Sequence, residues 1–166
     1  MFNEHNRPEA PMAAPPIEMI GAFLDFQRAT LLWKVSGLTD EQLRRPMVPS
    51  GTCLLALVKH SAAVETSWFQ TKFAGLDVPN TWRADDPDGD WRLEPDDTTE
   101  SIIASYVDAC EKSRAIVRTA SWNDPSKREG RRETLGWILC HMLEEISRHV
   151  GHADILREQI DGATGE

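Results

Sequence analysis

The chain lacks any long hydrophobic run. No segment of its 166 residues approaches the roughly 20 consecutive apolar residues that a membrane-spanning helix needs. Residues 1–16 also lack the apolar core of a signal peptide. With 40% hydrophobic and 27% charged residues, the composition is that of one ordinary globular domain. We therefore expect a cytoplasmic protein that has no membrane partner.

Positive charge is scarce as well. Eighteen Lys and Arg against twenty-seven Asp and Glu give a formal net charge of -9. The one basic cluster covers residues 127–132, and Glu129 and Gly130 interrupt it. A partner as anionic as DNA or RNA would be repelled by this net charge. We therefore expect no nucleic-acid partner.

Cysteine is sparse and unpaired in pattern. The three cysteines, Cys53, Cys110 and Cys140, are odd in number and show no CxxC spacing. Each lies in an apolar, helix-like context, which favours buried and reduced thiols. We therefore predict packing residues rather than a disulfide framework or reactive nucleophiles.

No run alternates apolar and polar residues for long enough to predict a strand, and we find no internal repeat. Apolar residues instead recur at steps of three, four and seven, which is typical of amphipathic helices. Gly37, Gly75 and Gly162 are expected to end three of these helices. The predicted long helices cover residues 17–37, from Ser50 or Thr52 to residue 74, from Thr98 or Thr99 to residue 120, and from Glu133 or Thr134 to residue 160, with a short turn after Thr39.

These elements predict an all-α fold, an antiparallel four-helix bundle with a long loop between its second and third long helices. Prolines at positions 8, 11, 15 and 16 exclude a helix from the start of the chain. We expect a flexible Pro-rich arm over residues 1–16, the bundle over residues 17–162, and a tail over residues 163–166. The loop over residues 76–98 carries Trp82 and Trp91 and is too long to be a simple connection, so we expect it to cover something.

Polar side chains fall on the apolar face of the last predicted helix. His149 lies in the centre of the stripe formed by Ile138, Met142 and Leu156, and Glu145 and His152 lie near it on one side. On the second long helix, His60 lies one turn from Leu57. Imidazoles from two facing helices are the usual way in which a bundle builds a metal site.

A single inward histidine is more often a hydrogen-bonded core residue than a metal ligand. Three inward polar groups on one helix change that balance, since without a cation their burial leaves a carboxylate and several polar atoms to satisfy. We therefore predict a divalent ion bound by His60, His149 and either His152 or Glu145. His141 lies at the edge of the stripe and is interpreted as a supporting residue.

Six segments together point to a known family: residues 31–44 (LLWKVSGLTDEQLR), 57–60 (LVKH), 62–65 (AAVE), 68–69 (WF), 90–92 (DWR) and 144–158 (EEISRHVGHADILRE). From residue 17 to residue 162 the chain resembles the DinB superfamily of bacterial helical bundles, specifically its actinobacterial, mycothiol-transferase-like branch. The resemblance implies a zinc, nickel or similar ion held by one histidine of the second long helix and two ligands of the last helix.

His60 matches the ligand that the resemblance implies on the second long helix. The usual pair on the last helix is spaced His-x-x-x-His. Here Glu145 and His149 fill that spacing, whereas His149 and His152 fill a shortened one, so both registers stay open, as does a site that uses all four residues. The resemblance also implies a low-molecular-weight thiol, mycothiol or bacillithiol, as cosubstrate.

Three functions follow as alternatives. The first is a metal-dependent transferase that uses such a thiol to modify small electrophiles. The second is a non-catalytic, metal-binding stress-response bundle with a structural ion. The third is metal-assisted hydrolysis with Glu65 or Glu145 as general base, although Glu65 is more simply interpreted as an exposed helix residue. We also expect that the bundle faces can support a homodimer.

Overall fold

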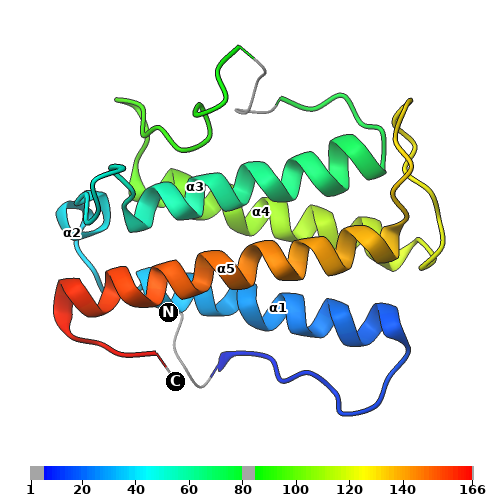
Figure 1. The fold of residues 1–166 in the computed structure, drawn as a ribbon, viewed down its shortest axis with the longest axis horizontal. Helices are drawn as coiled ribbons and strands as arrows, with labels where there is room; N and C mark the ends of the chain where they lie inside the picture. The colour runs from blue at the N-terminus through cyan, green and yellow to red at the C-terminus, as the bar shows by residue number, and fades with distance from the viewer. Residues whose placement is uncertain (1–5, 80–84, 166) are drawn as a thin grey trace.

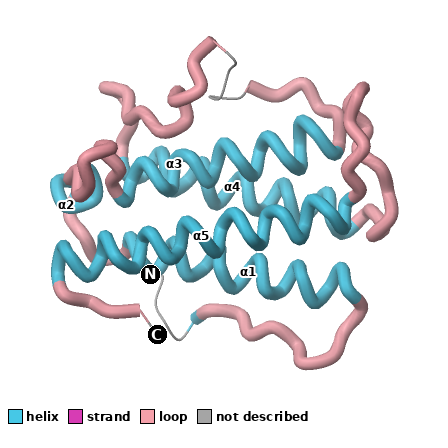
Figure 2. The backbone as a smooth tube through the Cα atoms, viewed as in Figure 1, coloured by secondary structure: helices cyan, strands magenta, loops and turns pink. Residues whose placement is uncertain are grey.

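The computed structural model describes residues 6–79 and 85–165, which form an all-α bundle (Figure 1). Figure 2 shows no strand in this part of the chain, where Pro125 and Thr134 form an isolated bridge. None of the helices within the described ranges is long and apolar enough to cross a membrane. The elements are α1 (Pro16–Val35), α2 (Asp40–Arg44), α3 (Leu54–Glu65), a π-helix η2 (Thr66–Phe73) that continues α3, α4 (Thr99–Arg118) and α5 (Leu135–Asp161).

Side-chain caps explain where most helices begin. Thr39, Thr98 and Thr134 each accept a hydrogen bond from a backbone amide in the first turn of α2, α4 and α5. At the other end of α5, Gly162 adopts a left-handed conformation with φ 78°, which only glycine adopts without strain. The predicted positions of these helices are confirmed.

The predicted start of α3 is wrong. Its N-cap is Cys53, which makes no capping hydrogen bond, rather than Ser50 or Thr52. The two hydroxyls lie 3.0 Å from each other, so they form a hydrogen bond with one another instead of with the helix. Hydrophobic burial therefore holds this end of α3, since Cys53 and Leu54 are both buried in the core.

The helices pack chiefly as two pairs, α1 with α5 and α3 with α4, and α3 also contacts α5 (Figure 1). Figure 1 shows that the helices within each of the two main pairs run in the same direction, while α1 and α3 run in opposite directions. At the ends of α1 and α5, Arg157 donates hydrogen bonds of 2.9 Å to the carbonyls of Lys34 and Ser36. The four-helix bundle is confirmed, and the long connection between η2 and α4 returns the chain along the bundle so that α4 runs parallel to α3.

One core fills the bundle. Its largest fully buried side chains include two aromatic residues, Tyr106 of α4 and Phe69 of η2. Apart from Glu65, the others are aliphatic residues of α1, α2, α3 and α5: Leu24, Leu31, Leu43, Leu54, Leu55, Leu57, Leu135, Ile138 and Leu139. Burying this much apolar surface is the main source of stability for such a domain.

The second long helix changes its winding at Thr66. The sequence predicts one regular α-helix as far as residue 74, but Thr66–Phe73 forms a π-helix. A π-helix has more residues per turn, so it shifts the face on which later side chains lie, and such segments are frequent at functional sites. Trp68 and Lys72 lie in this segment, so their positions cannot be derived from a period of 3.6 residues.

Two burial predictions are wrong. Glu65 is 1% exposed and accepts two hydrogen bonds from the buried Arg28, at 2.7 and 2.6 Å. Because both of its oxygens are engaged by a guanidinium, Glu65 is unsuited to act as a general base. Cys140 is exposed, because it lies on the solvent side of α5, whereas Cys53 and Cys110 are buried as predicted.

Residues 8–15 form no regular helix, as their prolines predict. Just before them, the Arg7 guanidinium lies 4.6 Å from the ring centre of Phe26 and 4.8 Å from that of Trp33, both in α1. This segment therefore contacts the bundle. The division of the chain into arm, bundle and tail stays a prediction.

Candidate metal centre

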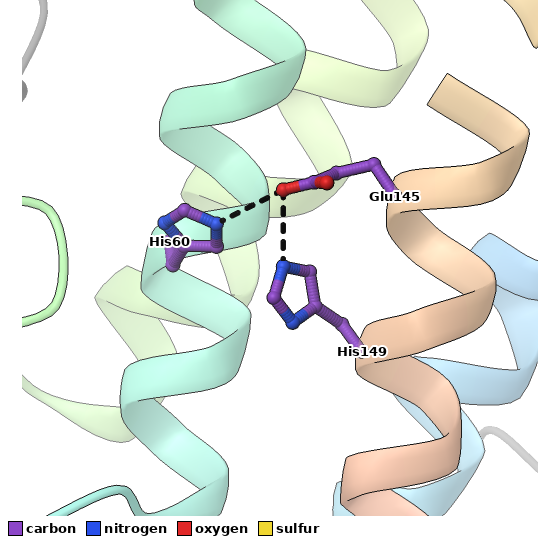
Figure 3. A group of neighbouring side chains, drawn as sticks. All are labelled: His60, Glu145 and His149. Atoms are coloured by element: carbon purple, nitrogen blue, oxygen red, sulfur yellow. Dashed lines mark hydrogen bonds and ion pairs between the residues drawn. The ribbon is translucent and has the colours of Figure 1, made fainter. Parts of the chain in front are cut away.

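Three polar side chains meet between α3 and α5 (Figure 3). His60 extends from α3, and Glu145 and His149 extend from successive turns of α5. The Oε1 atom of Glu145 lies 3.2 Å from Nε2 of His149 and 3.6 Å from Nε2 of His60. One potential ligand atom from each residue lies within 4.8 Å of the other two. The group offers two imidazole nitrogens and one carboxylate oxygen at a single point.

The charges of this group are set by its contacts. Hydrogen bonding to His149, followed by the contact with the His60 imidazole, holds the pKa of Glu145 well below its usual value, so that Glu145 is ionised. Burial would lower the pKa of His60. Its hydrogen bond with Asp90 and its contact with the Glu145 carboxylate outweigh burial and raise that pKa. The carboxylate is thus a ready electrostatic partner for a cation.

The residues fit a divalent ion. The Nε2 atom of His60, which faces Glu145, is buried and has no hydrogen-bond partner within the described chain. Buried polar atoms are normally satisfied, so such an orphaned nitrogen indicates a missing partner. Two histidine nitrogens and a carboxylate form a ligand set that suits zinc, nickel and related ions, and three protein ligands leave a coordination position open.

The long connection between η2 and α4 supports the site from outside. Asp90 is 3% exposed, and its Oδ2 atom lies 2.8 Å from Nδ1 of His60. The ring of Trp91 stacks on the His60 imidazole with centroids 4.0 Å apart and an angle of 17°. An Nδ1–H bond to Asp90 leaves the Nε2 lone pair free to face Glu145 and His149. Periodicity did not identify Asp90, although residues 90–92 are part of the family resemblance.

The other residues considered from the sequence lie elsewhere. His152 is exposed, with its ring centroid 5.7 Å from that of His149, and it does not join the group of three. His141 contacts two tryptophans instead. Its ring centroid lies 5.1 Å from that of Trp137 and 4.6 Å from that of Trp68. Trp82 lies outside the described residues. The other tryptophan of this loop, Trp91, contacts the site through its stacking on His60.

A cavity of about 430 Å³ opens beside His60. Its wall combines the aromatic ring of Trp68 with three cationic side chains of η2 and of the connection between α4 and α5. The residues that line it are His60, Ala63, Val64, Ser67, Trp68, Lys72, Asp90, Arg128 and Arg131. A small molecule bound there would lie in contact with one of the three converging residues.

Comparison with known proteins identifies a family but no individual relative. Comparison with curated proteins gives no match. A family model described as mycothiol-S-transferase matches residues 19–162, which include every long helix except the first residues of α1, and the candidate centre. The chain therefore belongs to the mycothiol-S-transferase family, a DinB-like family of helical proteins.

Proposed function

We propose that this protein is a metal-dependent transferase that uses mycothiol or a similar low-molecular-weight thiol to modify small electrophiles. The observation that supports this most is the convergence of His60, Glu145 and His149 beside a cavity, in a chain that belongs to the mycothiol-S-transferase family. Zinc or nickel suits these donors. We propose these three residues as the ligands, with His152 outside the set.

When bound, the ion would supply a Lewis acid that lowers the pKa of a thiol held beside it, so that thiolate is available at neutral pH. The chain's own residues prepare the site. Asp90 fixes the orientation and tautomer of His60, and Trp91 covers one face of its ring. Glu145 would supply one negative charge that offsets part of the charge of a divalent cation.

The protein's two buried cysteines are poor candidates for the reacting sulfur. Burial raises the pKa of Cys53, and burial followed by the charge of Glu65 raises that of Cys110, so both stay as neutral thiols. We therefore propose that the cosubstrate supplies the nucleophile. Its sulfur forms a bond to carbon while the leaving group departs with the bonding electron pair, and the thiol proton passes to solvent.

The direct test replaces the native ion with cobalt and adds mycothiol. We expect a new sulfur-to-cobalt charge-transfer band, together with thiol transfer that stops when the ion is removed by a chelator. His60→Ala should lose both signals. If mycothiol leaves the cobalt spectrum unchanged and no transfer occurs, the ion is structural and the transferase proposal is wrong.

A further inference from the structure

The cavity beside His60 has an unusual charge for this chain. Lys72, Arg128 and Arg131 all line it, in a protein whose formal net charge is -9. The one carboxylate that lines it, Asp90, is engaged by His60. Arg131 forms an ion pair with Glu133, leaving two cations without such compensation.

Backbone hydrogen bonds bring these cations together from distant parts of the sequence. The amide of Lys127 donates to the carbonyl of Phe73 at 2.8 Å, and the amide of Arg128 donates to that of Lys72 at 3.3 Å. The connection between α4 and α5 is thereby tied to the end of η2. The fold thus fixes the backbone of Arg128 beside that of Lys72.

Within the described chain, neither Lys72 nor Arg128 makes a salt bridge with a carboxylate. The Nζ atom of Lys72 lies 3.5 Å from the ring centre of Trp68 instead. Burial, followed by the nearby charge of Arg131, lowers the pKa of Lys72 to about 8. Holding these cations together is unfavourable without an anion, so the arrangement favours binding one.

We infer that the electrophile modified by this protein carries a carboxylate, which binds Lys72 and Arg128 in the cavity lined by His60 and Trp68. This inference rests on the proposed transferase function. The family description names mycothiol, an amide of N-acetylcysteine that has no carboxylate of its own, so the anion belongs to the electrophile. A carboxylate accepts hydrogen bonds from ammonium and guanidinium groups, and an adjoining apolar part of the molecule would contact Trp68.

Binding alone provides the first test. Isothermal titration of the purified, metal-loaded protein at pH 7 compares 3-nitrobenzoate with uncharged 3-nitrobenzamide, neither of which reacts with thiols. We expect tighter binding of the benzoate, weakened about tenfold or more in Lys72→Gln and in Arg128→Gln. Lys112→Gln is the matched control, since it removes one positive charge from an exposed pair on α4 that does not line the cavity.

The second test uses a reactive pair, 4-chloro-3-nitrobenzoate and 4-chloro-3-nitrobenzamide, with mycothiol and with uncatalysed rates subtracted. A carbon–sulfur bond replaces the carbon–chlorine bond, chloride leaves with the electron pair, and the thiol proton enters the buffer. We expect Lys72→Gln to raise KM for the benzoate at least tenfold while leaving KM for the benzamide within about twofold. A KM effect that is equal for both acceptors would overturn the inference.

The two proposals fail in different ways. If 3-nitrobenzoate binds no more tightly than 3-nitrobenzamide, the proposed carboxylate site is wrong, even if both aryl chlorides react with mycothiol. The opposite result is also possible: 3-nitrobenzoate binds as expected and Lys72→Gln lowers its affinity, but neither aryl chloride reacts faster than without protein. The anion site then stands and the proposed transferase function is wrong.

Discussion

The Nδ1 atom of His60 lies 2.8 Å from the Oδ2 atom of Asp90, although thirty residues of chain separate them. Asp90 is buried, and its other oxygen has no hydrogen-bond partner in the described structure. A buried carboxylate bound to one imidazole nitrogen orients the opposite nitrogen, which here faces Glu145 and His149. This contact links the long connection to the candidate metal centre.

Replacing Asp90 should therefore weaken metal binding without removing a ligand. We expect Asp90→Asn to lower affinity for zinc by about 10- to 100-fold, the range found when such outer partners are lost. Competition with a chelator of known affinity measures the change. Asp88→Asn, on an exposed residue of the same connection, is the control and should bind zinc normally. Equal affinity in both variants would show that Asp90 does not support the site.

The two registers on the last helix give opposite results for Glu145 and His152. Because Glu145 lies beside both imidazoles and His152 is exposed, Glu145→Gln should lower metal affinity at least about tenfold, whereas His152→Ala should bind nearly normally. His141→Ala should also retain its metal. Metal analysis after dialysis distinguishes the outcomes. Loss of the ion in His152→Ala but not in Glu145→Gln would favour the shortened register.

Removing one partner of the buried ion pair of Arg28 and Glu65 should strongly destabilise the protein. Breaking a buried pair leaves an uncompensated charge, so Arg28→Met should lower the free energy of unfolding by about 3–5 kcal/mol. The double variant Arg28→Met with Glu65→Leu should recover most of this loss, because neither charge remains buried. Urea denaturation measures both variants. Arg148→Met, in an exposed pair with Glu144, should change stability by less than about 1 kcal/mol.

Anion binding should depend on the protonation of Lys72, whose pKa burial and the neighbouring Arg131 lower to about 8. The affinity for 3-nitrobenzoate should fall as the pH rises through that value, because Lys72 loses its charge while the carboxylate stays ionised.

The same pKa also affects stability. Between pH 8 and the ordinary lysine pKa of 10.5, the unfolded chain binds more protons at this residue than the folded chain does. Lys72 therefore makes unfolding less favourable as the pH rises through this window.

Lys72→Arg provides the matched control, because an arginine stays charged throughout this range. Its affinity for 3-nitrobenzoate should be nearly constant from about pH 7 to pH 9.5. Titration at several pH values measures both proteins. A wild-type affinity that does not change across that range would contradict the predicted role of Lys72.

The cysteines should differ in their reactivity. Cys140 is exposed while Cys53 and Cys110 are buried, so one thiol should react with Ellman's reagent in the native protein and three after unfolding. Cys140→Ser should show no rapidly reacting thiol. The same variant should keep its transferase activity, since the proposed reaction takes its sulfur from the cosubstrate. Lost turnover in a well-folded Cys140→Ser would instead assign a role to this thiol.

The sequence by itself determined the helices and their assembly into a bundle. Apolar periodicity and local capping residues such as Thr98 and Thr134 specify where helices form, because these signals act between residues within one or two turns. The same periodicity predicted that His60 and His149 face inward, and both are buried. The long connection was predicted from its length and composition alone.

The tertiary structure alone decided which distant side chains meet. Periodicity could not pair Glu65 with Arg28. It describes the spacing of residues within one helix and does not show which side chain of another helix faces them. Nor could it predict the π-helix after Glu65, which moves Trp68 and Lys72 out of the regular helical phase. The bond from Asp90 to His60 and the meeting of Arg128 with Lys72 arise when loops dock on helices already formed, so their physical cause lies in packing and not in local pattern.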